Sequence, residues 1–384
     1  MVYDFYAELF LKDGKEIKNK IVEFKDKAAK REKWMEQNLP RFFRAELIAK
    51  NWYTIIKELS LFEKYYEGSD DVKKDDVKAG YKGFIQTIKV YPIDDSENLE
   101  NCEIFKEIKE PKINVGVLPG HSILIKVIFS LKKPYISRDD DDFYIVDNPV
   151  CKDKVFKVPL VRPSSWKGAL RYAAMEIILR KPSEGKINAR LALVRLFGNE
   201  KDKTEKFLDD QLGDESKSKY KQKVKEIYGE EPNLRGRLVF YPTFFDKIGL
   251  DVIAPHDRKT KTPARGPIYF ETVPEGAEGR GGTFSVLYFP FDLIGESEER
   301  VKKELKEDLE ILKEAIPAMF TKYGFGAKTT AGYGVILSKV KFQILPEMKE
   351  MTKDDYFGEE GSTFVGEMDG LMKSYGEECE QRRN

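Results

Sequence analysis

Between residues 122 and 344, short apolar runs with strand-like alternation are interspersed with longer stretches of helical spacing. The sequence predicts strands at 122–131, 236–245, 283–291 and 333–344, and helices at 166–180, 188–197 and 297–320. The order is therefore strand, helices, strand, strand, helix, strand. This βαββαβ order is the ferredoxin-like (RRM-like) plan, which RNA-recognition folds share. We predict an α+β palm of this kind at 115–345, and its function has to come from particular residues.

Four other segments flank or interrupt the predicted palm. Residues 1–114 combine helical spacing with a strand-like run at 84–91, and predict a partly helical, mixed α/β N-terminal extension. Residues 201–234 are a highly charged, helical insertion outside the sheet. Residues 253–271 form a long excursion between two strands, which predicts a β-hairpin. Residues 346–384 hold five Lys/Arg against eleven Asp/Glu with no sustained period, and predict a mobile or partner-bound acidic tail.

The composition excludes several classes of protein. The three cysteines, Cys102, Cys151 and Cys379, are far apart and support neither a disulfide framework nor a four-ligand zinc site, so a reducing cytoplasm is the natural setting. With only His121 and His256, histidine-rich catalysis is not favoured. No apolar run approaches the length of a membrane span, so no membrane partner is expected, and no organic cofactor is indicated. Net charge is zero overall, yet an anionic partner is compatible with the positive balance before the tail.

One stretch, residues 147–171, combines a carboxylate, basic residues and a predicted helix start. Ser164 or Ser165 can cap the helix that follows, and its free amides and dipole would attract a phosphate. Cations surround this end, namely Lys152, Arg162, Lys167 and Arg171. Asp147 fits such a surface only if it serves a role, such as holding a hydrated metal ion. The alternative is an ordinary turn followed by an ordinary cap.

The excursion at 253–271 carries a basic tip. Its cations are Arg258, Lys259, Lys261 and Arg265, and the aromatic residues Tyr269 and Phe270 follow them. Cations beside aromatic rings are typical of surfaces that bind single-stranded nucleic acid. The hairpin is therefore a candidate nucleic-acid finger, and the alternative is a hairpin that is merely solvated.

A glycine-rich turn joins the last predicted helix to the last strand. Its glycines and one cation are Gly324, Gly326, Lys328, Gly332 and Gly334. Glycines allow backbone amides to approach a phosphate closely. The turn is not a nucleotide P-loop, because Ala327 stands where a glycine must precede the lysine. A tight structural turn is the alternative.

Four motifs in this order resemble those of the RAMP superfamily, and within it the backbone subunits of type III CRISPR RNA-guided effector complexes. The resemblance covers roughly 122–344. The first motif runs from Asp147-Asn-Pro-Val150 through Lys152-Asp153 to Pro163-Ser-Ser-Trp-Lys-Gly168 and Arg171. The other three are Leu196-Phe-Gly198, Asp257-Arg-Lys-Thr260, and the glycine turn from Gly324 to Gly334.

The resemblance implies a palm-and-thumb subunit with the hairpin at 253–271 as the thumb. Its expected partners are a CRISPR guide RNA, target RNA, further copies of itself and other subunits of the complex. Asp147 would be required for cleavage of target RNA with Mg²⁺ or Mn²⁺. The guide would select the sequence by base pairing while the protein contacts the backbone.

Two alternatives stay open at this point. The chain could be a guide-RNA scaffold without chemistry, with cleavage left to a separate nuclease. It could also be an endoribonuclease that processes the guide precursor, a class that commonly relies on histidine, here His121 or His256.

Overall fold

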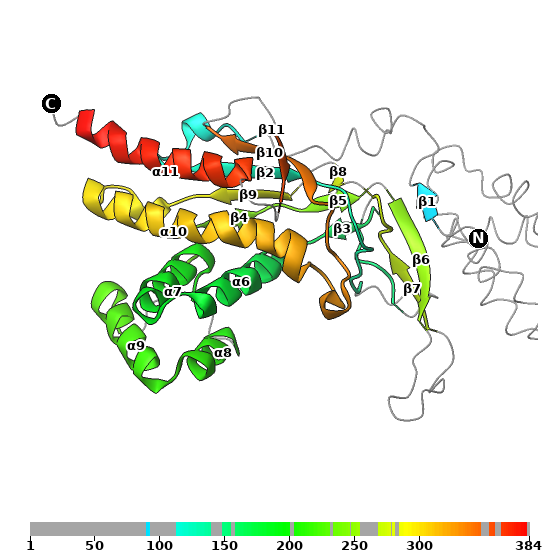
Figure 1. Ribbon diagram of the computed structural model, residues 1–384, viewed down its shortest axis with the longest axis horizontal. Coiled ribbons are helices and arrows are strands. Elements are labelled where there is room, and N and C mark those ends of the chain that lie inside the picture. Colours follow the sequence, from blue (N-terminus) through cyan, green and yellow to red (C-terminus); the bar gives the residue numbers. More distant parts are fainter. Residues whose placement is uncertain are drawn as a thin grey trace, which may run out of the picture. The chain divides into compact units, whose positions relative to one another are not determined.

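The structure of the chain, a computed structural model (Figure 1), describes residues 90–92, 113–139, 148–154, 158–199, 203–230, 233–245, 247–253, 268–277, 279–280, 284–346, 353–357 and 362–381. Contacts divide the chain into two compact units. Unit 1 contains Met1–Glu107, Ser137–Pro159 and Asp246–Pro274, and unit 2 contains Ile108–Ile136, Leu160–Phe245 and Glu275–Asn384.

A five-stranded antiparallel sheet runs through unit 2 in the order β11-β10-β2-β9-β4. Its strands are β2 (Ile123–Ile128), β4 (Leu238–Phe240), β9 (Phe284–Tyr288), β10 (Lys339–Leu345) and β11 (Lys353–Tyr356). Both faces of the central strand are apolar. Leu124 packs with Val115 and Leu287 on one face, while Phe129, just beyond the strand, packs on the other against α6 (Pro163–Arg180). The unit is therefore an α+β fold built on an antiparallel sheet.

Helix α10 (Glu298–Ala318) contacts α6, α7 (Ser183–Phe197) and α11 (Thr363–Gln381), and lies between them in Figure 1. Its buried side chains, including Leu305, Leu309 and Ile316, recur at helical spacing. The helix ends in a π turn, η5 (Met319–Tyr323), just after Pro317, which cannot donate a helical hydrogen bond. Short 3-10 turns lie at Val115–Val117 (η3), Phe291–Leu293 (η4) and Thr329–Ala331 (η6). Among the described helices, none has the length and apolar character needed to cross a membrane.

The predicted strands and helices between 122 and 344 are present, with two differences. The last strand, predicted from residue 333, begins only at Lys339. The run at 236–245 forms two strands, β4 and β5 (Thr243–Phe245), because Pro242 cannot continue the hydrogen-bonding pattern of a central strand. Strand β5 leaves the main sheet and pairs with β3 (Leu160–Val161) and β8 (Gly279–Arg280).

The charged insertion is helical, as predicted. It forms α8 (Lys203–Leu212) and α9 (Asp214–Tyr228). The insertion is anchored to α7 by Arg190, which donates a hydrogen bond of 2.6 Å to Asp209 and lies over the ring of Tyr220 at 3.8 Å. Tyr220 also packs with Leu191 and Val194 in a small apolar cluster, so the insertion is a firmly packed part of unit 2.

Residues 346–384 were predicted to be a mobile or partner-bound tail with no sustained period, but the part of the tail that the structure describes is regular. Residues 353–356 form β11, which extends the sheet, and 363–381 form α11. The sequence prediction missed the helical spacing of Phe364, Met368 and Leu371, all of them buried.

The start of α11 is held by Asp355. Its carboxylate accepts hydrogen bonds from the Ser362 hydroxyl (2.6 Å) and from the amides of Thr363 (2.9 Å) and Phe364 (3.0 Å). Burial alone would raise the pKa of Asp355, but these hydrogen bonds lower it below its usual value. The stabilisation is therefore present above the ordinary pKa near about 4 and is lost as the pH falls through the lowered one.

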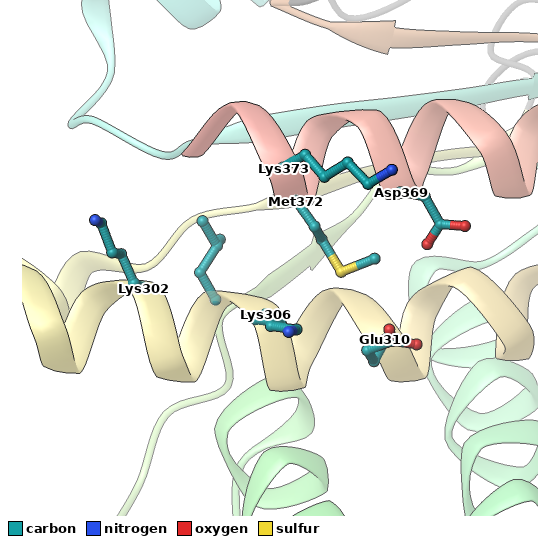
Figure 2. A pocket seen from close by; sticks show the side chains of 7 residues that line it. Lys302, Lys306, Glu310, Asp369, Met372 and Lys373 are labelled. Atoms are coloured by element: carbon teal, nitrogen blue, oxygen red, sulfur yellow. The ribbon is translucent and has the colours of Figure 1, made fainter. Parts of the chain in front are cut away.

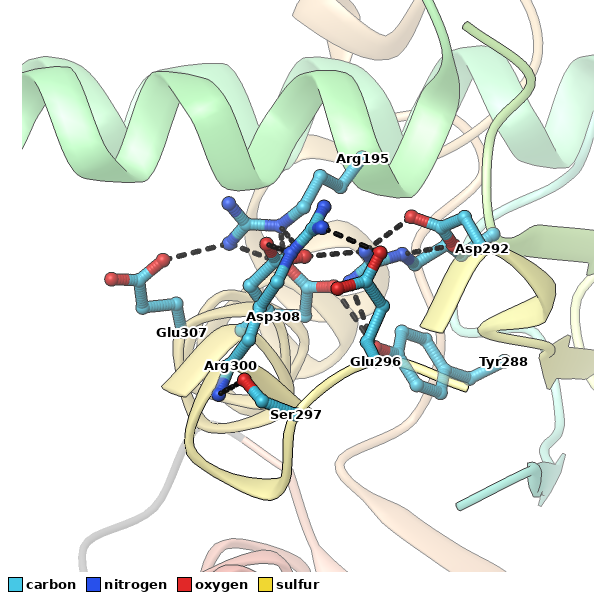
Figure 3. Close-up of polar contacts among 10 residues, drawn as sticks. Arg195, Tyr288, Asp292, Glu296, Ser297, Arg300, Glu307 and Asp308 are labelled. Carbon is cyan, nitrogen blue, oxygen red and sulfur yellow. Dashed lines mark hydrogen bonds and ion pairs between the residues drawn. The ribbon is translucent and has the colours of Figure 1, made fainter. Parts of the chain in front are cut away.

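A buried network of charges fastens α10 to α7 and to the β4–β9 side of the sheet (Figure 3). Arg237 donates to Asp292 and Glu304, and at 2.8 Å to Asp308. Arg195 of α7 donates to Asp308 at 3.0 Å. Burial alone would lower the pKa of Arg237, but the hydrogen bond to Asp292 and the charge of Asp308 raise it, so the guanidinium stays charged inside the fold.

Unit 1 contains a three-stranded antiparallel sheet in the order β1-β6-β7. The strands are β1 (Val90–Pro92), β6 (Lys247–Ile253) and β7 (Ile268–Thr272). The predicted excursion is therefore a hairpin at its base, with β6 and β7 as its arms. Residues 254–267, between the arms, lie outside the described residues, as do 1–89 and 93–112 of the predicted N-terminal extension.

We predict that Arg237→Met lowers the free energy of unfolding by about 3–5 kcal/mol, because it leaves three carboxylates without their shared buried partner. Urea denaturation measures the change. The control is Lys219→Met, which removes an exposed pair with Glu215 and should change stability by less than about 1 kcal/mol. Equal small losses in both variants would show that the fold does not depend on the network.

Candidate functional site

Helix α6 begins two to three residues earlier than a cap at Ser164 or Ser165 would predict. Its N-cap is Arg162, in an extended conformation, and Pro163 occupies the first helical position. Proline suits the first helical position because its ring fixes φ and it has no amide hydrogen that would be left unpaired. Proline also favours an extended conformation in the residue before it, here Arg162. Ser164 and Ser165 therefore lie inside the first turn, exposed, and the end has no side-chain cap, so the predicted serine cap is wrong.

Because no side chain caps the start of α6, the first amides of the helix are not bound by a side-chain oxygen. The Arg162 carbonyl accepts the amides of Ser165 and Trp166, which are the first helical hydrogen bonds. The first turn contains no carboxylate, so nothing there offsets the positive end of the helix dipole. Such an end is better suited to an external anion than a serine-capped one would be.

The glycine-rich turn is a tightly folded loop of unit 2. Gly324, Gly326, Gly332 and Gly334 all have positive φ, and so does Lys328 at 57°. A Cβ atom at Gly334 would lie 1.9 Å from the Phe325 carbonyl oxygen. The fold itself therefore requires glycine at this position, which agrees with the alternative of a tight structural turn. Binding of phosphate by this loop stays a prediction.

The loop is attached to the segment that follows β2. The Ala327 amide donates to the Ile136 carbonyl at 2.7 Å, and the Gly334 amide donates to the Pro134 carbonyl at 2.9 Å. A Cβ at Gly326 would lie 2.5 Å from that same Ile136 oxygen. The backbone of the loop is thus fixed before any ligand arrives, which is what a phosphate-binding loop requires.

The first turn of α6 and the glycine loop are neighbours, because Trp166 packs against Phe325 with ring centroids 4.5 Å apart. Trp166 is fully buried, and its indole nitrogen donates to Thr243 at 3.0 Å. Phe129 and Phe320 complete the aromatic cluster beneath both turns. The hypothesis of one shared surface required this adjacency, since a single RNA backbone could not otherwise contact both turns.

The predicted cations of unit 2 surround these turns. Arg162, Lys167 and Arg171 are half-buried along α6, and Lys328 is exposed on the glycine loop. Two lysines that the sequence prediction did not include join them. Lys132 and Lys133 both donate their amides to the Val335 carbonyl, directly after the glycine loop, and their side chains are exposed.

A tyrosine pair on α6 and η5 was also missed. Tyr172, which is 46% exposed, meets Tyr323 edge to face with ring centroids 5.4 Å apart. Arg180 donates to the Tyr323 hydroxyl at 2.7 Å. Burial raises the pKa of both tyrosines, so their hydroxyls are neutral at physiological pH. Tyr172 stands seven positions beyond Ser165 on α6, and an aromatic residue at that helical spacing is the signal that could have revealed it.

Lys152 does not belong to the candidate surface, which corrects the prediction that it binds RNA. Its side chain is buried in unit 1 and paired with Glu271 of β7. Glu271 also accepts the Val150 amide at 3.1 Å and donates its own amide to the Asn148 carbonyl at 3.0 Å. The lysine is buried because it neutralises Glu271, and together they hold the chain that follows Asp147 against the hairpin.

The remaining predicted site residues cannot be placed. Asp147, Arg258, Lys259, Lys261 and Arg265 lie outside the described residues. Within the described part of the chain, no three His, Cys, Asp or Glu side chains gather in a way that could hold a metal ion.

Two described carboxylates of unit 1 are already engaged. Asp139 accepts the Lys152 amide at 3.1 Å, and Glu271 pairs with the Lys152 side chain. They are therefore poor candidates for a second metal ligand.

Comparison with known proteins identifies the family. Residues 141–337 match the RAMP superfamily, and because this is more than half of the chain, the protein belongs to that superfamily. Over 202 residues it is 24% identical to the "CRISPR system Cms endoribonuclease Csm3" of Streptococcus thermophilus, covering 52% of this chain and 76% of that protein. The predicted resemblance to backbone subunits of type III effector complexes is confirmed.

Two solved structures are similar at lower levels. One is a chain in "Cryo-EM structure of the Type III-B Cmr-beta bound to cognate target RNA", with 15% identity, a TM-score of 0.41, and coverage of 84% of this chain and 98% of that one. The other belongs to a "CRISPR RNA-guided surveillance complex", with 14% identity, a TM-score of 0.31, and coverage of 57% and 68%.

We predict that Gly334→Ala lowers the urea midpoint of unfolding by far more than Gly332→Ala. The Gly334 variant meets backbone atoms and must displace Phe325, whereas a Cβ at Gly332 has nothing within 4 Å and bears only the cost of a positive φ, roughly 1–2 kcal/mol. Similar losses in the two variants would show that the loop can rearrange freely, and that its geometry is not fixed by packing.

Proposed function

We propose that this chain is a backbone subunit of a type III CRISPR effector complex, in which several copies bind along a guide RNA and engage complementary target RNA. The observation that carries the proposal is the adjacency of two phosphate-compatible turns on unit 2, the uncapped start of α6 and the glycine loop. Membership of the RAMP superfamily and the similarity to a Csm3 protein support it. The same assignment makes the cytoplasm its expected compartment.

In this proposal the protein contacts the RNA backbone and not the bases. The free end of α6, the fixed amides of the glycine loop and the nearby side chains of Lys167, Arg171 and Lys328 provide positive potential for successive phosphates. The exposed ring of Tyr172 offers a place for a base or ribose to stack. Sequence would be selected by pairing between guide and target.

The proposal also includes a palm and a thumb. Within the main sheet, β10, β2, β9 and β4 occur in the spatial order 4-1-3-2 of their sequence, which supports assigning unit 2 as a ferredoxin-like palm. The β6–β7 hairpin of unit 1 would be the thumb, with the basic residues at its tip directed at the guide–target duplex.

We expect Lys167→Glu and Arg171→Glu each to weaken guide RNA binding and to reduce its salt dependence. Each removes one phosphate contact, so the slope of log K against log salt should fall by about one unit. Filter binding or fluorescence anisotropy over a salt series measures this.

The control for this series is Lys221→Glu, on the exposed surface of α9. Unchanged slopes in both α6 variants, with the control behaving in the same way, would contradict the proposed surface.

We further propose that the subunit cleaves target RNA at Asp147. A carboxylate there could hold a Mg²⁺ or Mn²⁺ ion, which would supply positive charge beside the phosphate. In-line attack by the neighbouring 2′-hydroxyl would break the bond from phosphorus to the 5′-oxygen, leaving a 2′,3′-cyclic phosphate and a 5′-hydroxyl that takes up a proton in place of the one the 2′-hydroxyl loses. Hard oxygen ligands from RNA and water can complete the coordination of such an ion beside one carboxylate. The pairing of Lys152 with Glu271 supports this role indirectly, because it fixes the backbone just after Asp147.

Asp147→Asn is expected to abolish target cleavage, by at least about a hundredfold, while guide and target binding stay within about twofold of wild type. Cleavage by the wild-type complex should likewise stop when EDTA removes divalent ions. Gel-based cleavage assays and binding assays on the reconstituted complex measure both.

Asp153→Asn, at the partly buried carboxylate after Lys152, is the matched control and should leave cleavage intact. Undiminished cleavage by the Asp147 variant would instead assign the chain a scaffold role, with another subunit as the nuclease.

A further inference from the structure

A basic groove lies between α10 and α11, on unit 2 (Figure 2). It encloses about 440 Å³. The residues that line it come from both helices and are Lys302, Leu305, Lys306, Glu310, Asp369, Met372 and Lys373. We call it the α10/α11 groove. It is separate from the candidate RNA surface, because Glu310 and Tyr323 are 13 positions apart along α10 and η5, roughly 20 Å along the helix.

The groove is positively charged once its internal pairs are considered. Its two carboxylates share one cation, since Lys313 contacts Glu310 at 2.8 Å and Asp369 at 2.9 Å. At the other end of the groove lie Lys306 and Lys373, and both side chains are exposed. A ligand with several negative charges would therefore be attracted to that end.

The floor of the groove is apolar. Leu305 is buried, and Met372 is half-buried and points from α11 towards α10 between the lysines. A methionine floor adapts to the shape of an apolar side chain. The groove thus combines a place for carboxylates with a place for an apolar group, which describes an acidic peptide with an aromatic or aliphatic residue beside its charges.

Nucleic acid fits this groove less well than a peptide does. The lining has no aromatic ring on which a base could stack and no arginine, the side chain best matched to phosphate. Its far end also carries Glu310 and Asp369, which a continuing phosphate backbone would have to pass.

The chain itself contains a segment of the required chemistry. Residues 140–145 read Asp-Asp-Asp-Phe-Tyr-Ile, three carboxylates followed by two aromatic residues and one aliphatic. The described residues at its two ends are joined, since the Asp139 amide donates to the Pro149 carbonyl at 2.9 Å.

We propose that the α10/α11 groove binds residues 140–145 of a second copy of this chain, and so links neighbouring copies without RNA. The aspartates pair with the exposed Lys306 and Lys373, and the aromatic residues after them pack on Leu305 and Met372. Because Lys306 and Lys373 are exposed, salt screens the attraction, and the association weakens as salt is raised from about 50 mM towards 500 mM.

Paired charge reversals test the proposal with full-length protein. The groove variant carries Lys302→Glu, Lys306→Glu and Lys373→Glu, and the loop variant carries Asp140→Lys, Asp141→Lys and Asp142→Lys. Each variant alone should self-associate at least about tenfold more weakly than wild type, because like charges then meet. An equimolar mixture of the two should regain association, because each groove then meets a loop of opposite charge. Sedimentation velocity of the RNA-free proteins measures this.

A matched control carries Lys221→Glu, Lys223→Glu and Lys225→Glu on α9, three lysines exchanged on another exposed helix, and should associate like wild type. Circular dichroism confirms that all variants fold. Absence of salt-sensitive association in wild type, or a mixture no better than its components, would overturn the proposal.

Nucleic acid as the occupant is tested with oligouridylate. Loss of oligouridylate binding in the groove variant, with Lys167→Glu protein retaining it, would assign the groove to RNA and also overturn the proposal. Failure of RNA binding at α6 alone would affect the proposed function and not this one.

Discussion

The packing of Trp166 against Phe325 is the contact on which the candidate site depends. It brings the start of a helix and a loop more than 150 residues later onto one aromatic cluster, and the indole bond to Thr243 fixes the ring in place. Aromatic pairs of this kind contribute about 0.5–1.5 kcal/mol beyond the area that they bury. Because both turns rest on the same rigid support, their amides and cations are held together before RNA is present.

Some charged residues of this chain hold the fold together and others are accessible to a ligand, and the two groups differ in burial. Arg195 and Arg237 are buried and bound to carboxylates of α10, so they hold the helix layer to the sheet and are not accessible to a ligand. Lys306 and Lys373 are exposed in a groove whose acids are paired elsewhere. A count of charged residues does not distinguish these two arginines from these two lysines. Lys152 likewise shows that a basic residue in a family motif can have a purely structural role.

Local sequence patterns predicted the strands and helices correctly where residues close together in the chain decide the structure. The strands and helices of the palm were predicted because their apolar periods are long and regular, and the charged insertion was correctly expected to be helical. The serine cap was predicted wrongly because a proline at 163 competes for the helix start. The tail was predicted wrongly because three buried residues among many acids, Phe364, Met368 and Leu371, give a weak signal until α10 and β11 cover them.

The sequence by itself determined the family and the order of elements, since each depends on residue types at fixed spacing along the chain. Only the tertiary structure decided that the α6 start and the glycine loop are adjacent, that Lys152 is buried, and that α10 and α11 enclose a basic groove. Those features depend on contacts between residues far apart in sequence, which no local period encodes.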